Sequence, residues 1–439
     1  MADSPLNVFQ RLIRTWEAVH PYNAAQVLKL CGRADPAAAR AAWEQSLAAA
    51  GLGRVRIAGR TVFHETMGGL SQDHAVQILP PGTALTGHLS ESLNRRFDDP
   101  TEPPFRPFLI ADDDAWHFGV VYQHWIADSV SIRLLLREWC ARMYGPPSIQ
   151  TSPPSICKAG YWRAFGPSHC DVRPGQTALA LFRTHMRFRR VLKVAPTAGN
   201  DSPTRVLLHE LPEGLAEQLH RAARAAGANV GDILQAAVAQ ACRLHVPMQR
   251  RRNRRDIAIG NIVDLRRYAG PNRGSANPLD NALGLFLGFT QVFCRPDVLR
   301  DFPRLLRSIS LQNRAHRQSG IAQCSAGWML AALAMGRLVP PERLYRFYRK
   351  EIPLAAGLSN VNLNGSWAQA LHPLPLLDYI RVSPTGPMAP VVLNVTSLGR
   401  RMNLALTYRT ALLNEARAQA MVRSVAGAVL SAGGAYLVA

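Results

Sequence analysis

His124 and Asp128 are the residues whose types and spacing most directly suggest chemistry. They stand at the ends of the segment His124-Trp125-Ile126-Ala127-Asp128. A neutral imidazole, with an unperturbed pKa of about 6.5, accepts a proton near neutral pH, so His124 is a candidate general base. An HxxxD match is expected about once by chance in a chain with 13 histidines. Two plainer interpretations therefore stay open, a hydrogen-bonded core histidine and an aspartate that only caps a helix.

The elements that would position this pair follow from the apolar spacing around it. Residues 105–111 and 116–124 predict two strands, and the second one ends at His124. After Asp128 the spacing becomes helical, until Gly145-Pro146-Pro147 stops the helix. Because the end of a strand can hold a side chain rigidly over a crevice, this context favours a functional histidine.

Strands and helices are mixed through the rest of the chain. Asp35, which precedes Pro36, and Asn229 are predicted N-caps. Further helices are predicted over residues 6–19, 36–47, 215–226, 230–241, 302–315, 322–336 and 413–430. Further strands are predicted over residues 26–30, 206–211, 256–263, 286–294, 354–362, 376–383, 390–396 and 402–408.

A chain of 439 residues is too long for one ordinary core and predicts two units of about 200 residues each. We place an N-terminal lobe that carries HxxxD at residues 1–180 and a C-terminal lobe at residues 181–439. Both halves mix strands and helices, so we expect a paired α/β architecture with mixed sheets.

The chain is strongly basic, with a formal net charge of +21 and a pI near 10.6. Such a field attracts polyanions, although an arginine-rich composition also arises from genome composition alone. The basic clusters are Arg250–Arg255 and Arg343–Lys350, and most such runs are solvated faces. The arginines are not interleaved with aromatic residues in a nucleic-acid module, which argues against a nucleic-acid binder.

The seven cysteines are scattered, and neither a CxxC nor an HExxH spacing occurs, so we expect reduced thiols and no metal. The N-terminus lacks the pattern of a signal peptide. The longest uncharged stretch, residues 424–439, is shorter than the ~20 residues of a spanning helix. We therefore expect a cytoplasmic monomer.

Further segments extend the pattern around HxxxD over nearly the whole chain. They are His20-Pro21-Tyr22-Asn23, Leu28–Ala42, Pro104–Leu109, Leu215–Ala241, the G-x₅-R segment Gly260–Arg266, Gly284-Leu285-Phe286 and the pair Ser359-Asn360. In this order and spacing they resemble the superfamily of chloramphenicol acetyltransferase, the plant HxxxD acyltransferases and the condensation domains of nonribosomal peptide synthetases. The resemblance is closest to the condensation domains.

This resemblance implies two chloramphenicol-acetyltransferase-like lobes that form a V-shaped pseudo-dimer, with the site in a tunnel between them. His124 then takes the place of the catalytic histidine. Asp128 takes a structural place, paired with Arg266. An oxyanion needs a hydrogen-bond donor, and Ser359 or Asn360 is the candidate, a simple polar turn being the alternative.

The chain departs from the usual HHxxxDG of condensation domains at two positions. Gln123 replaces the first histidine and Ser129 replaces the glycine. Gly288 also stands where many condensation domains have asparagine. No adenylation or carrier domain accompanies the chain, so we expect a free-standing protein.

The resemblance implies an acyltransferase of natural-product or lipid biosynthesis without a permanently bound cofactor. The co-substrate would be an acyl thioester, either on an acyl or peptidyl carrier protein or on coenzyme A. The acceptor would be the hydroxyl or amine of a small molecule. The alternatives are a glycolipid or alcohol O-acyltransferase and a catalytically inactive protein that docks carrier proteins.

Overall fold

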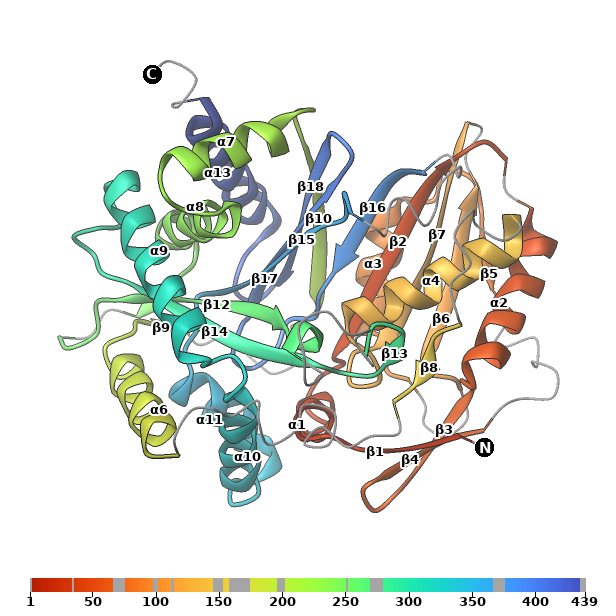
Figure 1. Ribbon diagram of the computed structural model, residues 1–439, viewed down its shortest axis with the longest axis horizontal. Coiled ribbons are helices and arrows are strands. Elements are labelled where there is room, and N and C mark those ends of the chain that lie inside the picture. Colours follow the sequence, from red (N-terminus) through yellow and green to blue (C-terminus); the bar gives the residue numbers. More distant parts are fainter. Residues whose placement is uncertain are drawn as a thin grey trace.

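The computed structural model describes residues 2–33, 35–65, 76–97, 102–111, 114–144, 153–157, 174–195, 202–249, 252–268, 279–365 and 376–434. Figure 1 shows two lobes, each with a central sheet, and the two sheets lie next to each other with most helices on the outside. This arrangement confirms the predicted α/β class with mixed sheets. Arg250, Arg251 and Cys170 lie outside the described residues.

The first lobe is built on a five-stranded sheet of order β16-β2-β7-β6-β5. Its strands are β2 (Asn23–Cys31), β5 (Gln77–Leu79), β6 (Phe105–Ala111), β7 (Ala115–Gln123) and β16 (Leu376–Val382). Its helices are α1 (Val8–Glu17), α2 (Pro36–Ala50), α3 (Leu85–Asn94) and α4 (Ser129–Tyr144). Helices α2 and α4 pack on each other, whereas α3 packs between this sheet and strand β10 of the second lobe.

The second lobe is built on a six-stranded sheet of order β10-β18-β17-β15-β12-β14. Its strands are β10 (Thr204–Leu211), β12 (Ile257–Asp264), β14 (Leu287–Cys294), β15 (Ala356–Asn362), β17 (Val391–Leu398) and β18 (Arg401–Arg409). The helices of this half are α6 (Pro174–Phe188), α7 (Leu215–Ala225), α8 (Val230–His245), α9 (Phe302–Ser319), α10 (Ser325–Gly336), α11 (Pro341–Glu351) and α13 (Glu415–Gly434). Of these, α8 lies on the sheet and α7, α9 and α13 pack around it.

Short elements complete the two lobes. A three-stranded sheet has the order β1-β4-β3, and two further pairs are β8 with β13 and β9 with β11. Their bounds are β1 (Ala2–Pro5), β3 (Arg54–Ala58), β4 (Thr61–Glu65), β8 (Ser155–Ile156), β9 (Lys193–Val194), β11 (Met248–Gln249) and β13 (Ala282–Leu283). A single 3₁₀ turn over Arg266–Tyr268 follows β12.

Local capping chemistry begins two helices where the sequence predicts it. The carboxylate of Asp35 accepts hydrogen bonds from the backbone N–H groups of Ala37 and Ala38 at the start of α2. Asn229 and Asp232 form a reciprocal capping box at the start of α8. Each cap satisfies backbone donors that have no partner inside the helix, so both predicted caps are confirmed.

The C-terminal half of the chain contributes one strand to the sheet of the first lobe. Strand β16 pairs antiparallel with β2, and Arg381 lies opposite Gln26 in this register. It also packs against β17 of the second lobe. Residues 376–382 thus complete the sheet of the first lobe, although they lie far along the chain from its other strands.

Two large apolar cores hold the lobes. One contains Trp43, Trp116 and Trp139, and the other lies between α8, α13 and the six-stranded sheet. Among the described helices, none combines the length and the apolar character needed to cross a membrane.

Candidate active site

The HxxxD segment forms the tight connection between β7 and α4. His124 directly follows the last residue of β7, and its backbone N–H donates to the carbonyl of Tyr22 over 3.1 Å. The imidazole stacks on the Tyr22 ring, with centroids 5.9 Å apart and planes 9° apart. The ring of Tyr122 meets the same imidazole edge to face. Two aromatic rings therefore fix the orientation of His124.

Hydrogen bonding decides which ring nitrogen of His124 carries the proton. Nδ1 lies 3.1 Å from the carbonyl oxygen of Ala127. A carbonyl oxygen only accepts, so Nδ1 donates and Nε2 keeps the free lone pair. Burial lowers the pKa of His124 below its ordinary value of 6.5, although the Ala127 carbonyl and the Asp128 carboxylate oppose this shift. The neutral imidazole that a general base requires is thus the favoured form near neutral pH.

Asp128 both caps α4 and forms a buried ion pair. Its Oδ1 accepts from the Ser131 N–H over 2.9 Å, as an N-cap does. Its Oδ2 lies 2.6 Å from Nη1 of Arg266 and also accepts from the Phe286 N–H over 2.9 Å. Burial alone would raise the pKa of Asp128, but Arg266 and these hydrogen bonds outweigh burial and lower the pKa. The carboxylate is therefore charged and held from three sides.

The arginine partner is equally enclosed. The side chains of Arg266 and Asp128 are 4% and 0% exposed, so water does not screen the pair. Nη2 of Arg266 also donates to the Ser131 hydroxyl over 2.9 Å and to the Ala282 carbonyl over 3.1 Å. Neither Asp128 nor Arg266 is among the described residues that line the cavity beside His124. The ion pair therefore stabilises the connection between β7 and α4, which contains His124, and does not itself form part of the cavity wall.

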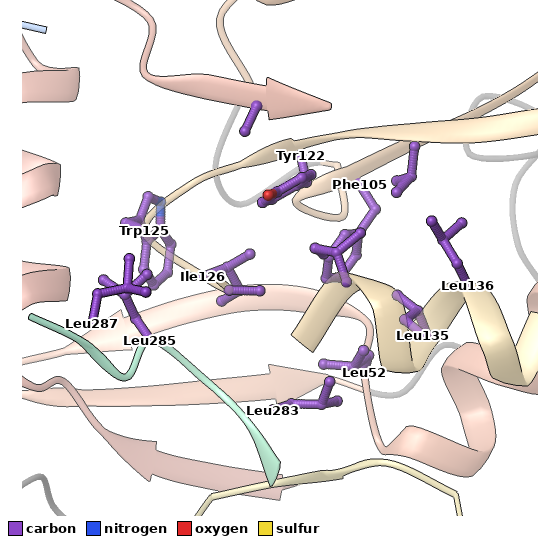
Figure 2. Packing of buried hydrophobic residues seen from close by; sticks show 14 of the residues in the cluster. Leu52, Phe105, Tyr122, Trp125, Ile126, Leu135, Leu136, Leu283, Leu285 and Leu287 are labelled. Atoms are coloured by element: carbon purple, nitrogen blue, oxygen red, sulfur yellow. The ribbon is translucent and has the colours of Figure 1, made fainter. Parts of the chain in front are cut away.

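The residues between His124 and Asp128 anchor the connection in the core. Trp125 is fully buried, and Figure 2 shows it beside Leu285 and Leu287, with Ile126 close by. These leucines belong to the segment that follows β13, which comes from the second half of the chain. Because close-packed interiors resist displacement, this anchoring limits the movement of the neighbouring His124.

A mainly apolar cavity of about 120 Å³ lies beside His124 and is lined from both lobes. Tyr22 and Gln26 contribute from the first lobe, whereas Gly260 and Leu358 contribute from the second. An apolar side pocket of about 60 Å³ shares Gly260 and other wall residues with it. We call the first of these two neighbouring spaces the tunnel and the second the side pocket.

Of the predicted oxyanion donors, only Ser359 lines the tunnel among the described residues. Asn360 follows it on β15, and successive side chains of a strand point to opposite faces. The Ser359 hydroxyl accepts a hydrogen bond from Nη1 of Arg381 over 3.1 Å. The sequence analysis did not select Arg381. The feature that could have indicated it is a single basic residue within the mainly apolar predicted strand 376–383.

The two departures from HHxxxDG have different surroundings. Gln123 is 2% exposed and is not among the described residues that line the tunnel. Ser129 does line the tunnel. Gln123, which stands where condensation domains usually have the first histidine, therefore does not contribute to the tunnel wall beside His124.

Part of the basic surface has a structural role. Arg254 donates from Nη1 to the backbone carbonyls of Phe188 and Val191, so it ties α6 to its neighbours and is not a free surface charge. Arg349 likewise donates to the carbonyl of Val194. Arg252 and Arg255 are exposed.

The lowered pKa of His124 predicts how a reaction that uses it as a general base would depend on pH. Protonation would remove this base, so kcat/KM should decrease toward acidic pH with a midpoint below pH 6.5. A pH–rate profile measures this, and returning each sample to neutral pH before assay controls for acid inactivation. An acidic limb with its midpoint above pH 6.5 would contradict the burial of His124.

The comparisons with known proteins agree on the fold. No protein-family model matches the sequence, and no curated protein matches it. Among solved structures, the condensation domain of the Monacolin K polyketide synthase MokA aligns with a TM-score of 0.64 at 12% identity, covering 99% of this chain and 98% of that chain. The cyclization-docking bidomain of the EpoB nonribosomal peptide synthetase from Sorangium cellulosum aligns with a TM-score of 0.65 at 12% identity, and the alignment covers 99% of this chain and 85% of that chain.

An acetyltransferase has the same architecture. The trichothecene 15-O-acetyltransferase TRI3 from Fusarium sporotrichioides aligns with a TM-score of 0.66 at 13% identity, covering 98% of this chain and 95% of that chain. The chain therefore has the two-lobed fold that condensation domains share with such acetyltransferases, as the sequence resemblance predicted. These identities are too low to carry an activity from one protein to another.

Proposed function

We propose that the protein is an acyltransferase that uses His124 as a general base. The acyl group would come from a carrier-protein or coenzyme A thioester and pass to a hydroxyl or amine acceptor. The observation that carries this proposal is the hydrogen bond from Nδ1 of His124 to the Ala127 carbonyl, in a histidine that lines the tunnel between the lobes. This hydrogen bond orients the neutral imidazole as a base in the space where two substrates can meet.

The proposed reaction needs no covalent enzyme intermediate. The acceptor oxygen or nitrogen attacks the thioester carbonyl carbon while Nε2 of His124 takes its proton, and the carbonyl electron pair moves onto oxygen. The Ser359 hydroxyl is the proposed donor to this oxyanion. When the tetrahedral intermediate collapses, the carbon–sulfur bond breaks and the leaving thiolate takes the proton from His124. The products are an ester or amide and a free thiol.

The side pocket indicates where an apolar acyl chain would fit. Its wall includes Trp328, Met329 and Ile352, and it adjoins the tunnel at Phe289 and Leu354. Apolar walls favour burial of hydrocarbon by roughly 0.8 kcal/mol per methylene group. We therefore propose that the donor acyl chain occupies the side pocket.

A panel of donors tests the proposed activity. The full chain is incubated with short and medium acyl groups on coenzyme A, on pantetheine and on acyl carrier proteins, each with amine and alcohol acceptors. Intact-mass detection of the acylated acceptor, dependent on His124, would support the proposal. Binding of carrier proteins without transfer of any acyl group would favour the inactive docking protein instead.

The basic surface is proposed to meet an anionic donor carrier. Reversing Arg252 and Arg255 to glutamate should raise KM for a carrier-bound donor several-fold and leave kcat nearly unchanged, because exposed charges act mainly on encounter. Acyl-pantetheine as donor should be unaffected, and steady-state kinetics with both donors measure the difference. Reversal of Arg254 is the contrasting control, since this residue binds two backbone carbonyls and its loss should affect both donors equally.

A nucleic-acid interaction would show itself in the same variant. Steep, salt-dependent binding of duplex DNA that the double reversal abolishes would argue against a carrier as the partner. An unchanged KM with both donors would mean that Arg252 and Arg255 are only solvated.

A further inference from the structure

Arg381 is a buried cation in the tunnel wall that pairs with no carboxylate among the described residues. Arg381 is 2% exposed and lies on β16, opposite Gln26. Burial, and next the charge of Arg133, lower its pKa to about 9, so it is still protonated at neutral pH. An unpaired buried charge is costly, and such groups gather at functional sites.

The hydrogen bonds of Arg381 converge on Ser359. Nη1 donates to the Ser359 hydroxyl over 3.1 Å, and Nη2 donates to the Ser359 carbonyl over 2.9 Å. The remaining contacts are the Val395 carbonyl and the Thr396 hydroxyl, which belong to β17. All four acceptors are neutral oxygen atoms, so the charge of the guanidinium is not cancelled.

This geometry determines what the Ser359 hydroxyl can do. Its oxygen already accepts from Arg381, so its own proton is available to be donated, and the hydroxyl donates no hydrogen bond within the described residues. A hydroxyl that accepts from a cation becomes a stronger donor, because hydrogen bonds in a chain polarise one another. Both residues line the tunnel together with His124.

We propose that Arg381 is the positioning residue of the oxyanion site: it orients Ser359 so that the hydroxyl donates into the tunnel, and it supplies the uncancelled positive charge behind it. The inference rests on the proposed acyl transfer and adds to it a specific charge that stabilises the tetrahedral oxyanion. In a cavity of low dielectric, such a charge acts strongly on a negative group within the same space.

The test uses two pantetheine thioethers of nearly equal size that cannot react. One ends in a methyl ketone and copies the neutral thioester, whereas the other ends in a methylphosphinate, a tetrahedral monoanion that copies the intermediate. Calorimetry measures their binding to the full chain, to Arg381→Met, to Arg381→Lys and to Ser359→Ala. Because binding is the readout, the result does not depend on which acyl donor or acceptor the protein uses.

The wild-type chain should bind the phosphinate at least about 10-fold more tightly than the ketone. Arg381→Met and Ser359→Ala should each lose roughly 10- to 100-fold in phosphinate affinity while ketone affinity changes by less than about 3-fold. The double variant Arg381→Met/Ser359→Ala should lose little more phosphinate affinity than the weaker-binding single variant, since the two residues act as a unit. Arg381→Lys keeps the charge and should retain more phosphinate affinity than Arg381→Met.

Three results would overturn the inference. Equal affinity of the wild-type chain for both compounds would show that the tunnel carries no anion preference. If Arg381→Met lost affinity for both compounds to the same extent, Arg381 would be a purely structural link between the lobes. Unchanged phosphinate binding in Arg381→Met would remove its role even if acyl transfer by the wild-type chain is observed, so the proposed function would survive without it.

Discussion

Replacing His124 with alanine should lower kcat by roughly 10²- to 10⁴-fold while the fold stays intact. The variant removes the only candidate base that lines the tunnel among the described residues. The side chain is held by rings and by one backbone carbonyl, so its loss costs few interactions that the fold requires. Steady-state kinetics give the rate, and thermal unfolding reports on the fold.

A second buried histidine provides the control for this variant. His64 lies on β4, is 3% exposed and is not among the tunnel residues. Its pKa is lowered to about 4, chiefly by burial, so it too is a neutral histidine at neutral pH. His64→Ala should reduce the stability and leave kcat within about 3-fold of wild type. If His124→Ala behaves in the same way, His124 is a core histidine and the proposed mechanism fails.

Breaking the Asp128–Arg266 pair should give the largest loss of stability. Arg266→Ala leaves a fully buried carboxylate without its partner, which typically costs about 3–5 kcal/mol. Asp128→Asn should also destabilise the protein, because the buried Arg266 then keeps only the more distant and partly exposed carboxylate of Asp264, 3.6 Å away, as an anionic partner. The double variant should lose less than the sum of the two, since neither charge then remains alone. Denaturant unfolding of the four proteins measures this coupling, and additive losses would contradict it.

An exposed ion pair gives the matched comparison. Arg56 and Glu65 are 3.3 Å apart, and their side chains are 52% and 45% exposed. Water screens such a pair, so the same cycle should yield a coupling of at most about 1 kcal/mol. The pH supplies a further check, because folding lowers the pKa of Asp128 from 3.8. Its contribution is complete above pH 3.8 and is lost as the pH falls through the lower pKa of the folded state.

Local sequence patterns were sufficient for most of the elements near the site. Strand β7 and helix α4 lie where the apolar spacing predicts them, with His124 and Asp128 at their junction. The caps at Asp35 and Asn229 are also local, because each depends on residues within three positions along the chain. Helices α3, α6 and α11 were missed. In α11 we considered only the basic run, and its buried positions Leu344, Tyr345 and Tyr348 stand between charged residues.

The sequence by itself determined the nature of the candidate base and the two-lobed fold class. Both depend on residue types and on their order along the chain, and the resemblance carried by HxxxD and G-x₅-R selected Arg266 as the partner of Asp128. The tertiary structure decided which donor enters the tunnel. Ser359 and Asn360 are equivalent in sequence, and only the orientation of β15 places Ser359 in the wall.

The tertiary structure also decided the charge of the site. Arg381 reaches Ser359 because β16 leaves the second half of the chain, pairs with β2 and brings its guanidinium against β15 and β17. Nothing in the local sequence specifies this pairing, since a strand can hydrogen-bond to any free edge and the choice is made by long-range packing. For the same reason Arg254 looked like part of a solvated cluster, although its partners, Phe188 and Val191, lie more than 60 residues away along the chain.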